Sequence, residues 1–519
     1  MDVPRSQDDA VTREGGLRAA LRRTVEWLDG PFDRCFGAAH NPLKQLGALG
    51  WFFYWIVAGS GLYLYAFFDT GVTNAYASVE WLTHDQWYLG GVMRSLHRYA
   101  SDGMVVVLVL HAAREFAKGR YRGARAFSWI SGVPLAGLLI ASGITGYWLV
   151  WDELAQYVAI ATTEWLDGLG IFGAAVARNF FSSAALSSRF FTLMAFLHIA
   201  VPLILLLGLW IHVQRQSHAQ TNPTRPLAVG TAIALIVLSF VHPALSQAPA
   251  DLDTVPAVVQ LDWFYLAAYP LLDVLAPLTV WGLAFGAAFA FVLVPWLPRR
   301  SRPPAAVVSL PNCNGCGRCV ADCPFNAVDM RARTDGSAYT EEAVVDPDLC
   351  TGCNICMGAC PTATPFRRAS GLVAGIAVPG QDLAALRERT VAAATALTGE
   401  HRILTFACEE TARTARAATQ GVVAVPCVGA VPPAFLDFVL SKGHADAVLL
   451  AACDEHSCQY RLGERWTEAR IARTRDPYLR ERVPRDRIAL VHCGHSRRTL
   501  DDAKATLRAH MESAAEERT

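Results

Sequence analysis

Hydrophobic residues gather in long runs within the first 300 residues, whereas the last 200 residues alternate short apolar stretches with charged ones. A run of about 20 apolar residues is long enough to cross a bilayer as a helix. The pattern predicts six membrane-spanning helices, at residues 46–68, 92–116, 128–150, 190–214, 227–245 and 263–297. We expect the last span to begin with a loop and a short helix, because it is long for one crossing.

The segment before these spans has a different pattern. Between residues 12 and 34, leucine and valine recur at helical spacing among charged residues. This periodicity predicts an amphipathic helix that lies on the membrane surface. Residues 1–40 are therefore expected to form an N-terminal amphipathic segment, and residues 41–300 an all-α transmembrane domain.

The charges are distributed unevenly between the loops. Lysine and arginine cluster after the second, fourth and sixth predicted spans, and aspartate and glutamate on the opposite side. Because positive loops stay in the cytoplasm, we expect a multi-pass protein of the inner (cytoplasmic) membrane, with both termini and the C-terminal 200 residues in the cytoplasm. Over the whole chain, 46 Lys and Arg balance 46 Asp and Glu, for a net charge of +0. This balance gives no reason to expect a nucleic-acid partner.

Two of the predicted spans carry a histidine at each end. His97 and His111 are 14 residues apart, and so are His198 and His212. Fourteen residues make nearly four helical turns, so the two rings of each helix face one side, roughly 21 Å apart along the axis. Two such helices can clamp two stacked haems, with each iron held by one histidine from each helix. The alternative, a histidine satisfied by a polar neighbour, does not explain why the spacing occurs twice.

Glycines repeat the same spacing. Gly47 and Gly61 lie 14 residues apart in the first predicted span, as do Gly132 and Gly146 in the third. Glycine lets a helix backbone approach a flat macrocycle closely, so we expect these four positions to contact haem. Ordinary helix packing through small residues is the alternative.

Three arginines flank the histidines, namely Arg94, Arg98 and Arg114. Guanidinium groups pair well with carboxylates, which makes these side chains natural partners for haem propionates. The alternative is anchoring of the helix ends at the cytoplasmic side, which suits Arg114 better than the other two.

Four stretches of this region resemble the cytochrome b of quinol-oxidising bc and bf complexes. They are Arg94–Arg98 (RSLHR), His111–Arg114 (HAAR), Gly143–Asp152 (GITGYWLVWD) and Arg189–Phe191 (RFF). The resemblance extends over residues 20–300. It implies two quinone sites, one near each membrane face, and a homodimer or larger complex.

The outer quinone site of that family ends in a Pro-Glu-Trp-Tyr motif, and the corresponding stretch here, residues 260–265, reads QLDWFY. Asp262 then takes the place of the glutamate that accepts the quinol proton, since either carboxylate can serve as a base. We expect Asp262, together with Tyr147 of the GITGYWLVWD stretch, to be catalytic. The alternative for Asp262 is a residue of an interfacial loop with no catalytic role.

Eight of the 14 cysteines form two runs of the type C-x2-C-x2-C-x3-C-P, after a proline-rich linker that ends at residue 312. Three closely spaced thiolates hold three irons of one cubane, and the fourth, turned away by the proline, ligates the other cubane. One [4Fe–4S] cluster is thus expected on Cys313, Cys316, Cys319 and Cys360. The other is expected on Cys350, Cys353, Cys356 and Cys323. The runs resemble those of two-cluster bacterial ferredoxins, and we expect an α+β ferredoxin-like domain at residues 305–368.

Beyond a linker with a helix at residues 369–399, strand-like and helix-like segments alternate over 400–519, which predicts a small α/β domain with a parallel sheet. Predicted strands at 403–407, 422–426, 447–452 and 488–492 each end beside a cysteine: Cys408, Cys427, Cys453 and Cys493. Cys458 follows Cys453 by five residues. The carboxyl edge of a parallel sheet is where such folds bind ligands, so these thiols predict a metal site.

Two stretches of this domain, 425–429 (VPCVG) and 450–460 (LAACDEHSCQY), resemble the iron–sulfur (delta) subunit of methanogen viologen-reducing hydrogenases. The resemblance implies one [2Fe–2S] cluster and electron exchange with the flavoprotein of heterodisulfide reductase. The expected ligands are Cys408, Cys427, Cys453 and Cys458. Cys493 remains an alternative for one of them.

Together these features predict the membrane subunit of a quinone-linked oxidoreductase. Electrons would move between a cytoplasmic flavoprotein or dehydrogenase subunit and the quinone pool through one [2Fe–2S] cluster, two [4Fe–4S] clusters and two b haems. The chain shows no dinucleotide fingerprint, so the primary substrate site is expected on another subunit. The alternative is the cytochrome b of a modified quinol-oxidising bc-like complex with a Rieske partner.

Overall fold

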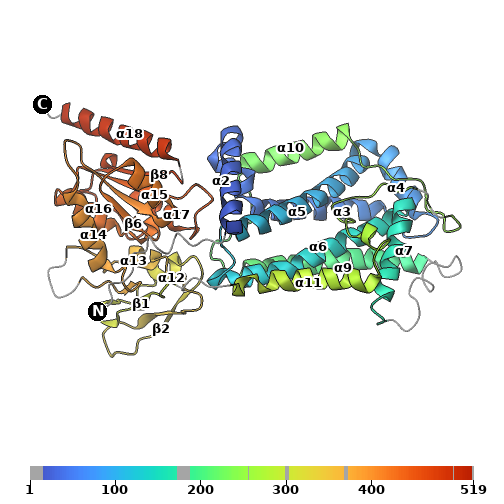
Figure 1. Cartoon of the computed structure of the whole chain (residues 1–519), viewed down its shortest axis with the longest axis horizontal. Helices are drawn as coiled ribbons and strands as arrows, with labels where there is room; N and C mark the ends of the chain where they lie inside the picture. The colour runs from blue at the N-terminus through green and yellow to red at the C-terminus, as the bar shows by residue number, and fades with distance from the viewer. Residues whose placement is uncertain are drawn as a thin grey trace. The chain divides into compact units, whose positions relative to one another are not determined.

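The computed structural model describes residues 16–171, 188–297 except 255 and 257, 303–366, and 372–516 except 495. The chain forms two compact units, the first of residues 1–214 and 219–297, the second of residues 215–218 and 298–519. Figure 1 shows that the first unit is helical, whereas the second contains sheets.

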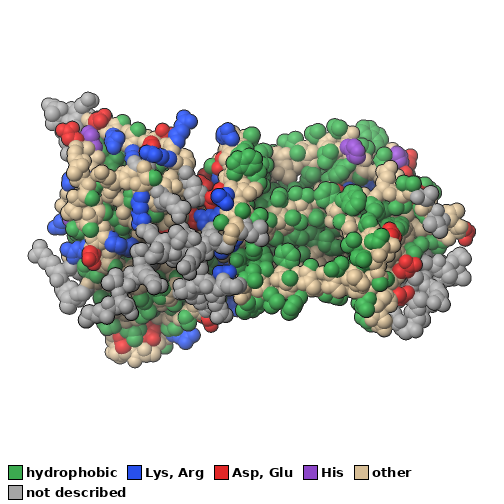
Figure 2. Space-filling view, in the orientation of Figure 1, with side chains coloured by type: hydrophobic (Ala, Val, Ile, Leu, Met, Phe, Trp, Pro, Cys, Tyr) green, Lys and Arg blue, Asp and Glu red, His purple; other side chains and the backbone are tan. Residues whose placement is uncertain are grey.

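Helices occupy all six places where spans were predicted. They are α3 (Leu46–Phe67), α5 (Val92–Ala117), α6 (Ala126–Val150), α9 (Ser188–Val213), α10 (Arg225–Val241) and α11 (Pro277–Leu293). Within the described residues, four helical stretches are long and apolar enough to cross a membrane: Leu46–Phe67, Gly123–Val150, Phe191–Val213 and Pro277–Trp296. Figure 2 shows hydrophobic side chains over most of the visible surface of this unit, as expected for helices that face lipid.

The sixth helix begins later than the apolar run suggests. The predicted span starts at residue 263, but α11 starts at Pro277, and a short 3-10 turn, Tyr269–Leu271, lies before it. Proline is favoured in the first helical turn because its missing N–H would have no partner there. The expected loop and short helix at the start of this span are therefore present.

Among the described residues of the first unit, three further helices lie outside the apolar runs. One is α2 (Gly16–Phe36), which covers most of the predicted amphipathic segment. The others, α4 (Ala75–His84) and α7 (Glu153–Asp167), occupy segments that their acidic residues suggested were loops. The start of α7 is fixed by Asp152, whose carboxylate accepts a hydrogen bond from the amide of Ala155 at 2.9 Å, a typical N-cap.

The helices pack in two pairs that matter for the site. Helix α5 packs along α3, and α9 packs along α6. Each helix that carries two of the predicted histidines thus lies against a helix that carries two of the spaced glycines. In Figure 1, α5 and α3 run above α6 and α9 within this unit.

The second unit begins with two short antiparallel ribbons. Strand β1 (Val307–Val308) pairs with β4 (Ile376–Ala377), and β2 (Val328–Ala332) pairs with β3 (Glu341–Val345). The short helices α12 (Arg318–Asp322) and α13 (Ile355–Ala359) each lie within one of the two cysteine runs. Since β4 lies beyond residue 368, this part of the fold extends further than the predicted boundary.

A four-stranded parallel sheet follows, with strand order β6-β5-β7-β8. Its strands are β5 (Ile403–Cys408), β6 (Val422–Val425), β7 (Ala447–Ala452) and β8 (Ile488–His492), within a residue of the predicted bounds. The helices of this part are α14 (Leu383–Thr395), α15 (Glu409–Ala418), α16 (Pro433–Ser441), α17 (Gly463–Ile471) and α18 (Arg497–Glu516). The sequence analysis missed α15 because it is polar, and only small residues such as Ala412 and Ala415 are buried from it.

Candidate functional site

The four histidines of the helical unit form two pairs across the helices. The rings of His97 on α5 and His198 on α9 lie 6.2 Å apart between centroids. His111 and His212 also lie close enough to interact electrostatically. A metal between two imidazoles needs about 2 Å of bond on each side, so 6.2 Å between ring centres leaves room for one iron.

Each histidine ring faces one of the four spaced glycines. A Cβ added to Gly61 would lie 2.9 Å from Cε1 of His97, and one added to Gly146 would lie 2.9 Å from Cε1 of His198. The other two glycine–histidine contacts are less close. The corresponding distances are 3.6 Å from Gly47 to His111 and 3.5 Å from Gly132 to His212. The repeated spacing of glycines therefore matches the histidines ring by ring.

Hydrogen bonds fix the orientation of three of these rings. Nδ1 of His97 donates to the carbonyl of Val57 at 3.0 Å, and Nδ1 of His198 donates to that of Ser142 at 3.1 Å. Nδ1 of His212 lies 3.0 Å from the hydroxyl of Ser131. A ring whose Nδ1 is engaged in this way presents Nε2 as the free lone pair for a metal.

The hydroxyl residues beside these rings were missed by the sequence analysis. Ser60, Ser131 and Thr145 all lie within 3.3 Å of a histidine Nδ1. A signal for them exists, since each one immediately precedes one of the spaced glycines.

The three flanking arginines all have carboxylate or hydroxyl partners. Arg114 binds Asp29 of α2 with two hydrogen bonds of 2.7 and 2.9 Å, and both side chains are buried. Arg94 binds Thr83 and Ser246. Asp29 was not anticipated, because a bond between residues 85 positions apart leaves no pattern in one sequence.

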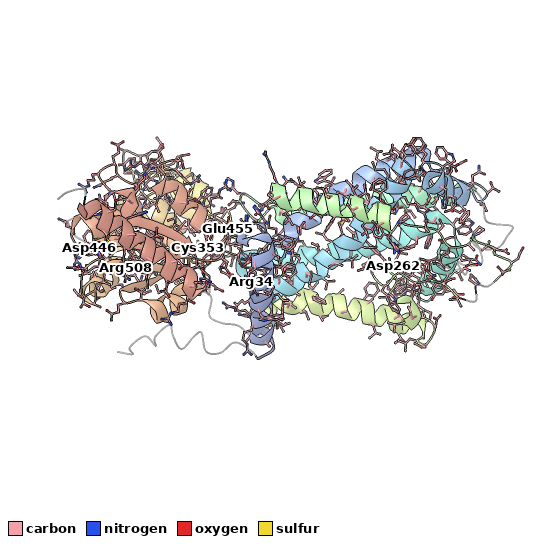
Figure 3. The ribbon with its side chains drawn as sticks, turned by 90° about the horizontal axis from the view of Figure 1, so that it is seen from above. Arg34, Asp262, Cys353, Asp446, Glu455 and Arg508 are labelled. Carbon is pink, nitrogen blue, oxygen red and sulfur yellow. The ribbon has the colours of Figure 1, made fainter. Side chains whose placement is uncertain are left out.

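The predicted outer quinone residues come together. Tyr147 donates a hydrogen bond to Oδ2 of Asp262, and Arg98 forms an ion pair with the same oxygen at 3.1 Å. Asp262 is only 7% exposed. In Figure 3, Asp262 lies toward the end of the first unit opposite Arg34 of α2. Tyr265 packs closely here too, since a Cβ on Gly143 would overlap its ring.

The first predicted cubane site is a cavity. Its lining includes Cys313, Cys316, Cys319 and Cys360, together with Gly375 and other apolar residues. Cys316 is exposed, and Cys319 and Cys360 are buried. Burial and the nearby thiols raise the pKa of Cys319 to about 12. Several of these thiols can therefore be deprotonated together only when a cation lies among them.

The second group contains Cys350, Cys353, Cys356 and Cys323, whose thiols interact electrostatically with one another. Backbone amides point at two of the sulfurs. Ala306 N lies 3.4 Å from Cys350 Sγ, and Ala327 N lies 3.2 Å from Cys323 Sγ. Such amides stabilise anionic sulfur and tune the potential of an iron–sulfur cluster.

Four thiols of the parallel-sheet part form a closed ring of hydrogen bonds. Cys408 bonds to Cys427 and Cys453, and Cys458 bonds to the same two. All four are buried. Hydrogen bonds from its two neighbours lower the pKa of Cys408. The pKa of Cys427 is raised by its hydrogen bonds to Cys408 and Cys458 and by burial. The donor set therefore suits a positively charged iron–sulfur centre.

Cys493 lies elsewhere. It belongs to a separate apolar core with Leu500 and Leu507, and its thiol faces the carbonyl of Ala452 at 3.6 Å. Burial raises its pKa to about 12, so it is a protonated thiol. Among the described residues, no three His, Cys, Asp or Glu side chains converge closely enough to hold a single metal ion.

Comparison with known proteins gives three matches along the chain. Residues 39–217 match the cytochrome b/b6/petB family, residues 312–364 the 4Fe-4S dicluster domain, and residues 403–500 the delta subunit of methyl-viologen-reducing hydrogenase. The chain is a cytochrome b/b6 domain followed by a 4Fe-4S dicluster domain and a hydrogenase-delta domain. The three resemblances derived from the motifs are thereby confirmed.

Two individual proteins are similar to part of this chain. Cytochrome b6 of Emiliania huxleyi is 27% identical over 165 residues, which make up 31% of this chain and 76% of that protein. A chain of a hyperthermophilic respiratory Complex III has a TM-score of 0.41 and 18% identity, over 49% of this chain and 75% of the other. The cytochrome b/b6 domain implies haem b in a multi-pass membrane protein, and the dicluster domain implies iron–sulfur clusters.

The contact between Gly146 and His198 can be tested in the cytochrome b/b6 domain. We expect Gly146→Val to push the His198 ring aside and to lower the haem b content toward half, because one histidine pair is disturbed. Gly137→Val on the same helix is the matched control, since nothing lies within 4 Å of a Cβ there. The pyridine haemochrome assay of both purified variants measures the difference. Equal haem content would contradict the assignment.

The ring of four thiols predicts that two cysteine variants will differ in iron content. Cys427→Ala should remove the iron of the hydrogenase-delta domain, whereas Cys493→Ala, at an equally buried thiol, should retain it. Iron and acid-labile sulfide per protein, with the visible absorption spectrum, measure the outcome. Loss of iron in Cys493→Ala alone would make Cys493 the ligand instead.

Proposed function

We propose that this protein is the membrane electron-transfer subunit of a quinone-linked oxidoreductase. It would move electrons between a cytoplasmic flavoprotein or dehydrogenase subunit and the quinone pool. The observation that carries the proposal is the presence, in one chain, of two cross-helix histidine pairs, two cubane motifs and a ring of four buried thiols. Such a series of centres suits one-electron transfer, and the cofactors supply the redox chemistry.

The cofactor set of the proposal is two b haems, two [4Fe–4S] clusters and one [2Fe–2S] cluster. His97 with His198, and His111 with His212, would hold the haems through Nε2. Cys313, Cys316, Cys319 and Cys360 would hold one cubane, and Cys350, Cys353, Cys356 and Cys323 the other. Cys408, Cys427, Cys453 and Cys458 would hold the [2Fe–2S] cluster. The ring of bonds among these last four thiols supports this set over one that includes Cys493.

The protein would contribute to electron transfer by holding the cofactors in fixed positions and by shielding them from water. The glycines at positions 47, 61, 132 and 146 let the neighbouring helices close on the histidines. The sulfurs are mostly buried, and amide donors compensate their charge. Fixed ligands and fixed dipoles limit the rearrangement that a change of charge would otherwise cause.

The outer quinone site of the proposal is the group of Asp262, Tyr147 and Arg98. Asp262 would accept a proton from quinol, and Tyr147 would hold the carboxylate by its hydroxyl hydrogen. Arg98 forms an ion pair with Oδ2 of Asp262 at 3.1 Å and would hold the carboxylate in place. The buried position of Asp262 supports this role over that of an interfacial loop residue.

The orientation of the proposal places both termini and the iron–sulfur domains in the cytoplasm, on the evidence of the basic loops. An electron that crosses the membrane through the haems then moves with or against the membrane potential. This is worth about 2.3 kcal/mol per 100 mV. The pathway could thus conserve energy or use the potential to reduce a low-potential acceptor.

A second candidate is the cytochrome b of a modified quinol-oxidising bc-like complex, with a Rieske protein as outer partner. The observation in its favour is the assembled outer group, because a quinol-oxidising site needs a base beside the substrate. Anaerobic purification from native membranes in mild detergent separates the two. A cytoplasmic flavoprotein that co-purifies supports the first proposal, and a Rieske protein or outer cytochrome c supports the second.

The role of Asp262 yields a direct test. Asp262→Asn should slow quinol-dependent haem reduction at least about tenfold, because general-base catalysis typically contributes that much or more. Asp253→Asn, an exposed carboxylate of the preceding loop, is the matched control. Stopped-flow spectroscopy of haem reduction by a quinol analogue gives both rates. A normal rate in Asp262→Asn would remove this residue from the mechanism.

A further inference from the structure

Three glycines bring the cysteine-bearing segments of the second unit into backbone contact. A Cβ on Gly358, between Cys356 and Cys360, would overlap the carbonyl oxygen of Gly429. One on Gly429 would lie 2.8 Å from Cα of Gly463, and one on Gly463 would overlap Sγ of Cys427. The segment around Gly429 therefore lies between Gly358 of the dicluster part and Gly463, where helix α17 begins.

Side chains fill the same junction. Cys427, Ile355, Leu462 and Trp466 form one small buried cluster, against which Cys353 packs. Tyr460 packs there too and interacts electrostatically with thiols of both sites, among them Cys353 and Cys427. The second cubane site and the ring of four thiols are thus neighbours.

One guanidinium is buried at this junction. Arg470 of α17 is 1% exposed, and its Nη1 donates to the carbonyl of Gly429 at 3.2 Å. It also forms an ion pair with Asp322, the residue before Cys323. Gly429 follows Cys427 by two residues, so the guanidinium lies between a ligand-bearing segment of each site.

The charges around Arg470 are few. Asp322 is shared with Arg475, whose Nε donates to it at 2.8 Å and whose guanidinium stacks over Trp466 at 3.5 Å. Glu464, on the same helix, bonds Cys458. Burying such an ion pair is weak evidence for a role in stability, because desolvation offsets most of the attraction.

We propose that Arg470 is a positioning residue that joins the two clusters and raises their reduction potentials. A cluster gains a negative charge when it is reduced, and a fixed cation in a low-dielectric site lowers the energy of that state. Because Arg470 lies between the Cys427 and Cys323 segments, its charge would shift the potentials of both neighbouring centres in the same direction. The inference rests on the proposed cofactor set.

The test compares Arg470→Met with Arg470→Lys in the full-length protein in detergent, by redox titration followed with EPR. In Arg470→Met we expect the ratio of reduced to oxidised cluster at fixed potential to fall at least tenfold, or about 59 mV for one electron, at the [2Fe–2S] cluster and the second cubane. Arg470→Lys should shift less, because the charge remains. Asp322→Asn should shift both centres in the opposite direction.

Two control variants locate the effect. Arg482 is exposed and pairs with Asp437, which belongs to neither cysteine-bearing segment, so Arg482→Met should change neither centre. Arg333 donates to the carbonyl of Cys313 at 2.6 Å, so Arg333→Met should move only the first cubane.

Unchanged potentials in Arg470→Met with full iron content would overturn the inference. So would equal cluster loss in Arg470→Met and Arg470→Lys without a shift in Asp322→Asn, since Arg470 would then be structural only. A wild-type protein without a [2Fe–2S] signal would instead refute the proposed cofactor set. The shift of the second cubane in the same variants would still decide the role of Arg470.

Discussion

The close approach of a histidine ring to a glycine backbone is the contact on which the helical unit depends. It occurs four times, between α3 and α5 and between α6 and α9. Because both members of each contact recur every 14 residues, the two helices of a pair must run in register over nearly four turns. A shift of one helix by a single residue would turn its side chains by about 100° and break both contacts together.

Much of this arrangement could be predicted because it is periodic. The histidine and glycine spacings, the cysteine runs and the strand ends are all patterns within one short stretch of chain. The structure adds partners that are far apart in sequence, such as Asp29 for Arg114 and Arg98 for Asp262. These pairs leave no pattern in a short stretch of sequence, so they could be found only from the three-dimensional structure.

The differences between prediction and structure have related causes. Apolar content placed the start of the sixth span at residue 263, but Pro277 sets where the helix begins. The polar helices α4, α7 and α15 were missed because short helices with a narrow buried face leave a weak periodic signal. Cys493 ends a strand as the other cysteines do, yet its thiol enters a different core, since a residue's position along an edge does not fix the direction of its side chain.

The polar groups that surround the proposed ligands differ between the two units, and the difference matches the charge of the ligands. In the helical unit the proposed ligands are imidazoles, and their Nδ1 atoms meet carbonyl and hydroxyl oxygens. In the second unit the proposed ligands are thiols, and backbone amides and Arg470 lie beside them or their segments. An acceptor on the non-ligating N–H of a metal-bound imidazole makes the ring a stronger ligand, whereas donors and cations around sulfur favour the reduced cluster. The two units thus surround their proposed ligands with groups of opposite polarity, which would tune the potentials of haem and iron–sulfur centres by different means.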